Sequence, residues 1–145
     1  MTHATPTPDR ASLLAGITQA DLAATVLRVT MGVLFLAHAW MKIVLFTPAG
    51  TVAFFESLGL PGFLAWVVIA AEGLGGIALI LGLWSRWVSL ALLPILLGAI
   101  YPHWDAGFFF SNPGGGWEFP AFWSVALVVQ AILGNGAFAL GRERG

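Results

Sequence analysis

Four long apolar runs dominate this 145-residue chain, and they restrict its fold more than any other feature of the sequence. They cover about 22–46, 63–84, 87–101 and 119–140. A helix that spans a bilayer needs roughly 17–25 mainly apolar residues, so the first, second and fourth runs are long enough to cross. The third run is short and contains Pro94, so we expect a kinked or tilted helix that borrows its flanks. The pattern predicts an all-α fold, a transmembrane four-helix bundle.

The composition agrees with a lipid environment. Hydrophobic residues make up 59% of the chain and charged residues 9%, whereas soluble domains contain about 25% charged residues. A soluble protein this apolar would lack the polar surface needed to cover itself. The net charge of -1, with six Lys and Arg spread along the chain, indicates no nucleic-acid partner. The absence of Cys excludes a disulfide scaffold, thiolate metal ligands and redox chemistry on the chain's own thiols.

The chain divides into three segments. Residues 1–17 begin with a polar, Pro-rich stretch and are predicted to form a flexible N-terminus, in which 11–17 is a candidate for a short interfacial helix. They do not resemble a signal peptide, because the apolar run that follows starts late and is too long. The first helix should therefore stay in the membrane. Residues 18–141 form the predicted four-helix membrane domain, and 142–145 form a short cytoplasmic tail.

Local signals place the ends of the predicted helices. Thr18 followed by Asp21 is typical of a capped helix N-terminus with an acid in its first turn. The Pro-Gly pair at 61–62 marks a break before the second run. The junction at 85–86 is so short that the second and third helices must be antiparallel neighbours. A long third connection, about 102–118, contains a run of glycines after a proline and cannot be regular structure.

The basic residues predict how the bundle is oriented. With four spans, all five arginines lie on or near one side, and only Lys42 lies toward the other. Because basic residues favour the cytoplasmic side, both termini and the turn at 85–86 should be cytoplasmic. Five of the seven tryptophans then lie near the outer interface, as in an aromatic belt: Trp40, Trp66, Trp104, Trp117 and Trp123.

Glu72 lies near the middle of the second run, where an ionisable group is costly, at roughly 2.5–3.5 kcal/mol. Small residues surround it, including the glycines at 73, 75 and 76, so another helix can pack closely. Gln130 lies at a similar depth in the fourth run, and Arg28 of the first run could reach toward Glu72. Two interpretations stay open. These three residues form a structural network that sets the helix register, or Glu72 accepts a proton or binds a ligand.

The first run carries a second set of candidate residues on one helical face. Met31, Phe35, His38 and Lys42 recur at i, i+4, i+7 and i+11. Imidazole exchanges protons near neutral pH and an ammonium holds an oxyanion, so His38 and Lys42 suit the carbonyls of a quinone headgroup. The alternative is that Lys42 extends to the outer headgroups and His38 bonds a loop carbonyl.

The third connection holds the remaining polar candidates. His103, Asp105 and Glu118 could form a polar rim over the outer end of the bundle, but their spacing does not indicate a metal site. The phenylalanines at 108–110 could dip back into the membrane or act as a lid, or the segment is a plain interfacial loop. Nothing in the chain resembles a nucleophilic triad, a phosphate-binding loop or a dinucleotide fingerprint.

In this order and at this spacing, the chain resembles the DoxX family of small four-helix membrane proteins over about 22–141. The residues that carry the resemblance are Leu27-Arg28, Gly32 to His38 and Lys42; Phe54-Phe55 and Leu58 to Pro61; Glu72 to Gly76, Leu81 to Leu83 and Arg86; and His103, Gly107 to Phe109, Asn112, Gly116 and Glu118 to Pro120. The resemblance implies a membrane subunit linked to oxidoreductase function, with associations to thiosulfate:quinone oxidoreduction, quinone or catechol stress and membrane-bound oxidative-stress complexes.

The preferred hypothesis from the sequence is a quinone-interacting membrane subunit of an oxidoreductase or oxidative-stress system. It is expected in a bacterial-type cytoplasmic (inner) membrane, with the quinone headgroup in the outer half of the bundle. The predicted catalytic residues are His38, Glu72, His103 and Glu118. The predicted cofactor-binding residues are Arg28, Phe35, Trp40, Lys42, Trp117 and Gln130. No haem, flavin or metal site is apparent, so a partner protein would have to supply the electrons.

A competing hypothesis is non-enzymatic. The chain would be a membrane anchor or assembly subunit whose buried charges are structural, and it would contact a protein partner or a second copy through the phenylalanine-rich third connection and the tail. A small-molecule carrier is a third hypothesis, disfavoured because no inverted repeat is evident. In each case the lipid bilayer is a partner.

Overall fold

The computed structural model describes residues 16–141, which form helices joined by turns and one long loop. The elements are α2 (Gln19–Trp40) with its π-helical continuation η1 (Met41–Leu45), α3 (Pro48–Ser57), α4 (Phe63–Leu81), α5 (Ser85–Ile100) with its 3-10 continuation η2 (Tyr101–His103), and α6 (Glu118–Leu133). No β-strand occurs within this range. The predicted interfacial helix over 11–17 lies mostly outside the described residues, and the tail over 142–145 lies wholly outside them.

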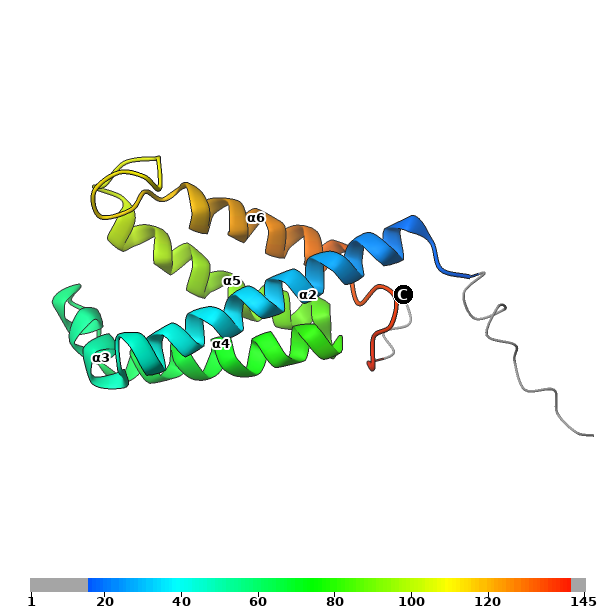
Figure 1. The fold of residues 1–145 in the computed structure, drawn as a ribbon, viewed down its shortest axis with the longest axis horizontal. Coiled ribbons are helices and arrows are strands. Elements are labelled where there is room, and N and C mark those ends of the chain that lie inside the picture. The colour runs from blue at the N-terminus through cyan, green and yellow to red at the C-terminus, as the bar shows by residue number, and fades with distance from the viewer. Residues whose placement is uncertain (1–15, 142–145) are drawn as a thin grey trace, which may run out of the picture.

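Helices α2, α4, α5 and α6 run alongside one another, which confirms the predicted four-helix bundle (Figure 1). Helix α3 and the loop before α6 lie at one end, here called the loop end. The start of α2, the turn over 82–84 and the segment 134–141 lie at the other, here called the terminal end. The described chain ends therefore share one end, as an even number of crossings requires. That this end is cytoplasmic stays a prediction.

The spans differ in length from those expected. Three helical stretches are long and apolar enough to cross a membrane, namely Gln19–Leu45, Phe63–Leu81 and Ser85–His103. The third run, judged short from the sequence, reaches this length because η2 extends α5 past Ile100 and α5 continues through Pro94. The fourth run was predicted to continue to about 140, and this is wrong. Helix α6 has 16 residues and ends at Leu133, where Gly134 departs from helical geometry.

Several helix ends follow the local signals. Thr18 and Asp21 form a reciprocal capping box, with Thr18 N–H 2.9 Å from Asp21 Oδ2 and Asp21 N–H 3.1 Å from Thr18 Oγ1. Helix α4 begins directly after the Pro-Gly pair at 61–62. The turn to α5 was predicted at 85–86, and this is wrong, because α5 begins at Ser85 and the turn is made by residues 82–84. Gly82 takes the left-handed conformation that ends many helices.

The bundle is built from two helix pairs. Helix α2 packs most closely on α4, and α5 on α6, while contact between the pairs is less extensive. At the first interface a Cβ atom on Gly32 would lie 2.7 Å from the carbonyl oxygen of Gly76, so the two backbones approach as the small residues predicted. Gly75 likewise faces Leu92 of α5. Gly73 was also read as a packing glycine, and this is wrong because nothing lies within 4 Å of its Cβ position.

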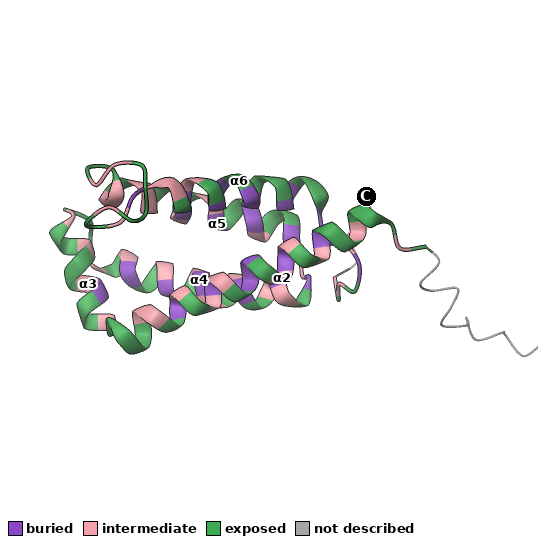
Figure 2. Ribbon diagram, turned by 45° about the horizontal axis from the view of Figure 1, so that its top comes forward, coloured by how far each residue is buried: buried purple, intermediate pink, exposed green. Residues whose placement is uncertain are grey.

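Burial divides each helix into an inner and an outer face (Figure 2). The core consists of Met31, Phe35, Leu79, Leu92, Leu96, Trp123, Ala126 and Leu127. The outer faces carry large apolar side chains, such as Leu74 and Ile132, that are about 70% and 71% exposed within the chain. Apolar residues around the whole circumference of a helix are typical of a bundle surrounded by lipid.

The segment 134–141 closes the terminal end. Leu140 N–H donates to the Leu81 carbonyl at 2.9 Å, and Gly141 N–H donates to the Gly82 carbonyl at 3.0 Å. Asn135 Oδ1 accepts from Ser85 N–H at 2.9 Å. These bonds satisfy backbone groups at the end of α4 and the start of α5, which would otherwise lack partners.

Candidate functional site

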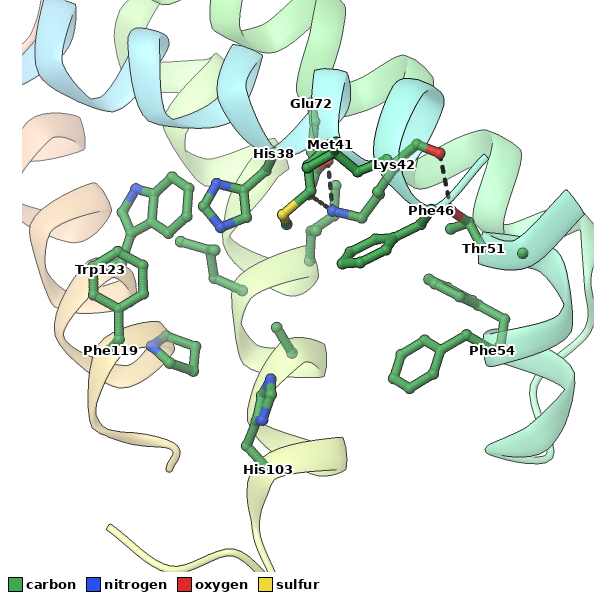
Figure 3. Close-up of a pocket in the computed structure, with 17 residues that line it drawn as sticks. His38, Met41, Lys42, Phe46, Thr51, Phe54, Glu72, His103, Phe119 and Trp123 are labelled. Atoms are coloured by element: carbon green, nitrogen blue, oxygen red, sulfur yellow. Dashed lines mark hydrogen bonds and ion pairs between the residues drawn. The ribbon is translucent and has the colours of Figure 1, made fainter. Parts of the chain in front are cut away.

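A cavity of about 810 Å³ opens between the two helix pairs at the loop end (Figure 3). Every helix of the described chain contributes to its wall. Its polar side chains are His38, Lys42, Thr51, Glu72 and His103, and its aromatic side chains are Phe46, Phe54, Phe55, Phe119 and Trp123. A mainly apolar cavity with a few convergent polar groups is the usual form of a small-molecule site.

Lys42 and Glu72 form an ion pair at this cavity. The Lys42 ammonium donates to both carboxylate oxygens of Glu72, with Nζ 2.8 Å from each. The side chains are 17% and 5% exposed. Pairing offsets the high cost of each charge inside the membrane. The alternative that Lys42 extends to the outer headgroups is therefore wrong, and the cation beside Glu72 is Lys42 rather than Arg28.

The π-helical turn η1 positions Lys42. In this turn the Phe46 N–H donates to the Met41 carbonyl at 2.9 Å, so the Lys42 carbonyl is not taken by Phe46. The Thr51 hydroxyl, which is buried, lies 3.2 Å from that carbonyl and 3.0 Å from the Thr47 carbonyl. Helix α3 is thereby joined to the turn that carries Lys42. Such π-helical turns occur frequently at functional sites.

His38 lies one helical turn before Lys42. Its Nδ1 is 2.9 Å from the Leu34 carbonyl oxygen. A carbonyl only accepts, so Nδ1 carries the hydrogen and Nε2 of the neutral ring is left as an acceptor. The ring packs on Trp123, with centroids 4.9 Å apart. The alternative that His38 bonds a loop carbonyl is wrong, because its partner belongs to its own helix.

His103 faces the cavity from the opposite side to His38 (Figure 3). Its Nδ1 donates to the Gly114 carbonyl at 3.0 Å, which again leaves Nε2 as the acceptor of the neutral ring.

His103 also borders a second cavity of about 720 Å³ under the third loop, and Glu118 borders that cavity rather than the first. One Glu118 carboxylate oxygen accepts from Phe110 N–H at 2.8 Å. Asp105 is exposed and lines neither cavity.

Phe35, Trp40 and Trp117 were predicted to bind the cofactor, and none of them lines the main cavity. Phe35 is fully buried and supports the wall from behind, with its ring centroid 4.5 Å from that of Trp123. Trp40 is 54% exposed on the outer face of α2. Trp117 stacks on Trp104 in the third loop, with centroids 5.6 Å apart.

Arg28 and Gln130 also lie away from the cavity, so the predicted network with Glu72 is wrong. The Arg28 guanidinium donates to the carbonyls of Leu79, Ile80 and Ala137 at the terminal end. Gln130 donates to the Gly134 carbonyl at 2.7 Å, four residues along the chain. Both interactions are with backbone near helix ends, and neither involves a carboxylate.

Thr51, Phe54 and Trp123 also line the cavity and were not among the site residues predicted from the sequence. Thr51 and Phe54 belong to α3, which was not predicted, although Thr47 followed by Pro48 is a helix-start signal. Trp123 had been assigned to the outer aromatic belt. Its spacing from the buried residues Leu127 and Gln130 would have indicated an inward face.

Together, the bundle and its internal cavity define a small integral membrane protein with a candidate ligand site at the loop end. The chain belongs to the DoxX family, whose sequence model matches residues 23–110. The matched part contains His38, Lys42, Glu72 and His103 and ends before α6.

Two relatives extend this comparison. Over 80 residues the chain is 38% identical to "Putative oxidoreductase CatD" of Bacillus subtilis (strain 168), a stretch that covers 55% of this chain and 58% of that protein. Over 127 residues it is 32% identical to "Inner membrane protein YqjF" of Escherichia coli (strain K12), covering 84% of this chain and 92% of that protein. The chain thus spans little more than half of the first relative and nearly all of the second. No solved structure matches it.

Proposed function

We propose that this protein binds a quinone headgroup in the main cavity and acts as a membrane subunit of an oxidoreductase. The observation that carries the proposal is the placement of the Lys42–Glu72 pair and His38 in an aromatic-walled cavity. A planar, largely apolar ring with polar oxygens matches these walls, since aromatic side chains pack against its faces and the polar groups meet its edge. The name of the Bacillus relative supports an oxidoreductase role.

The same proposal assigns roles and a location. His38, Glu72 and His103 exchange protons with the ligand, and Lys42 holds Glu72 in place and contacts a ligand oxygen. Glu118 passes protons through the second cavity, which meets the first at His103. The electrons come from a partner protein. The name of the Escherichia relative supports placement in a bacterial inner membrane.

The proposal is tested by identifying what copurifies with the protein. The chain is purified in a mild detergent, and extracted lipids are analysed for quinones by mass spectrometry. Quinone should accompany the wild type and Trp40→Phe, a control on the same helix outside the cavity. Quinone should be absent from the variants His38→Ala and Glu72→Gln. Only preparations with the helicity and gel-filtration elution volume of the wild type are compared. If no quinone accompanies any sample, and neither added decyl-benzoquinone nor its hydroquinone binds, the proposal is wrong.

A second candidate function is that of a membrane anchor for a partner protein. It is supported by exposed aromatic side chains in the third loop, where Trp104, Phe109 and Phe110 are 61%, 60% and 70% exposed. Under this function a partner copurifies in fixed stoichiometry with the wild type, His38→Ala and Glu72→Gln alike, and no quinone is found.

A further inference from the structure

Most polar hydrogen atoms of the cavity side chains already form hydrogen bonds within the protein. This restricts which hydrogen-bonding groups a ligand can use in the cavity. An ammonium has three hydrogens, and Lys42 directs two of them to Glu72 Oε1 and Oε2. The third has no acceptor among residues 16–141. Lys42 therefore offers a ligand one donor.

The other polar groups of the cavity offer acceptors. His38 and His103 use their Nδ1 hydrogens on the carbonyls of Leu34 and Gly114, so each neutral ring presents Nε2 as an acceptor. The Thr51 hydroxyl hydrogen is directed at backbone carbonyls, so its oxygen can only accept from a ligand. The carboxylate of Glu72 also only accepts.

Among the described residues, Trp123 is the one further side-chain donor in the wall, and its indole N–H lies away from the polar side chains. Its Nε1 is buried and has no partner in the described part of the chain. Figure 3 shows this nitrogen on the edge of the indole that is remote from His38 and Lys42. The polar side of the cavity therefore combines several acceptors with a single ammonium hydrogen.

We infer that the cavity selects the reduced, hydroxyl-bearing form of an aromatic headgroup, a hydroquinone, over the oxidised quinone. This inference rests on the proposed function and adds the redox state of the ligand. A phenolic hydroxyl donates to His38 Nε2 and accepts from Lys42 Nζ. A quinone carbonyl accepts from Lys42 but leaves Nε2 without a hydrogen. In a cavity with apolar walls, an unpaired acceptor is costly, so the two forms differ strongly in affinity.

The test compares both redox forms on the full-length protein in detergent. Decyl-benzoquinone and its anaerobically maintained hydroquinone are titrated by calorimetry. We expect the hydroquinone to bind about tenfold more tightly or better, the ratio associated with one unmatched buried hydrogen bond. His38→Phe should bring the two affinities together, because it keeps a ring against Trp123 and removes the acceptor. Trp40→Phe should keep the wild-type ratio.

A second ligand pair keeps the test independent of variant folding and of redox chemistry. A 4-alkoxyphenol and its methyl ether have the same ring and oxygens, but only the phenol can donate. The phenol should bind wild type about tenfold more tightly. Equal or tighter binding of the quinone or of the ether overturns the inference while leaving the proposed function intact. Retention of the preference in folded His38→Phe also overturns it. If neither redox form binds, the proposed function itself fails.

Discussion

Two cations of the first membrane span, Arg28 on α2 and Lys42 on its continuation η1, show how the two ends of the bundle differ. Arg28 is 1% exposed at the terminal end, and its partners are backbone carbonyls of the last turn of α4 and of Ala137. Lys42 lies at the loop end, has a carboxylate partner on α4 and borders a cavity.

The physical basis of each arrangement is different. The planar guanidinium fork of Arg28 reaches three carbonyls at once, and the end of α4 carries the partial negative charge of its exposed carbonyl groups. Its charge is thus partly offset without a carboxylate. Lys42 is compensated by Glu72 and still has a hydrogen to offer. The comparison teaches that one cation joins helix ends through backbone carbonyls, whereas the other is paired with a carboxylate at the wall of a cavity.

The largest effect is expected from Glu72→Gln. It leaves the Lys42 ammonium buried beside a neutral amide, and breaking a buried pair in this way costs about 3–5 kcal/mol. We expect a loss of that size in the free energy of unfolding, measured in mixed micelles, together with loss of ligand binding. The double variant Lys42→Met/Glu72→Gln should regain most of the stability and none of the binding. If the double variant is no more stable than Glu72→Gln, the two charges are not coupled as the structure indicates.

Arg28→Met should have the next largest effect, and on stability alone. It removes three charge-assisted hydrogen bonds, to the carbonyls of Leu79, Ile80 and Ala137, which should cost about 2–3 kcal/mol. The Leu79 carbonyl still accepts from Gly82 N–H, and the Ala137 carbonyl still lies 2.7 Å from the Thr25 hydroxyl. Unfolding in mixed micelles measures the loss, and calorimetry on the folded fraction should return the wild-type ligand affinity. A ligand affinity that falls more than tenfold would show that the two ends do not have separate roles.

Gly32→Ala tests the close contact between α2 and α4 at Gly32 and Gly76, in which Gly32 lies between Arg28 and Lys42 along the chain. The added Cβ would meet the Gly76 carbonyl at 2.7 Å, so α2 and α4 must separate at a cost of about 1–3 kcal/mol. Because Arg28 on α2 and Lys42 on η1 both contact α4, stability and ligand affinity should fall together. Gly73→Ala is the matched control on α4, since nothing lies within 4 Å of its Cβ position, and it should leave both measurements unchanged or slightly raise the stability.

The smallest effects come from a matched pair of threonines. The hydroxyl of Thr51 lies near the Lys42 carbonyl at the loop end, and that of Thr25 lies 2.7 Å from the Ala137 carbonyl at the terminal end. Replacing either by Val should cost about 1 kcal/mol in unfolding free energy. Only Thr51→Val should weaken ligand binding, measured by calorimetry. An equal loss of affinity in Thr25→Val would contradict the distinction between the ends.

Much of the fold was predictable because its signals are local. The hydropathy of α2, α4 and α5, the capping box at Thr18 and the break before α4 each depend on a few neighbouring residues. The limits of α5 and α6 were not predictable from apolar content alone, because apolar residues continue past Leu133 while Gly134 and Gly136 turn the backbone. Apolar content reports an affinity for lipid, whereas the end of a helix depends on backbone geometry.

The candidate site was predicted in part. The spacing of His38 and Lys42 placed both on one helical face, and Glu72 was identified from its depth in an apolar run. Four of the ten predicted residues line the cavity: His38, Lys42, Glu72 and His103. The contribution of α3 was missed, since whether this short helix covers the bundle or lies apart from it depends on its packing against α4 and η1.

The sequence by itself determined that this is an all-α membrane protein of the DoxX type with ionisable groups inside its helices. Only the tertiary structure decided which cation meets Glu72. Arg28 lies on α2 and Lys42 on its continuation η1. The distance of each from Glu72 depends on the register between this span and α4, which the close contact at Gly32 and Gly76 sets. That register places Arg28 against the end of α4 and Lys42 against Glu72. Apolar content and cost of burial are properties of each residue, whereas an ion pair is a property of two helices packed together.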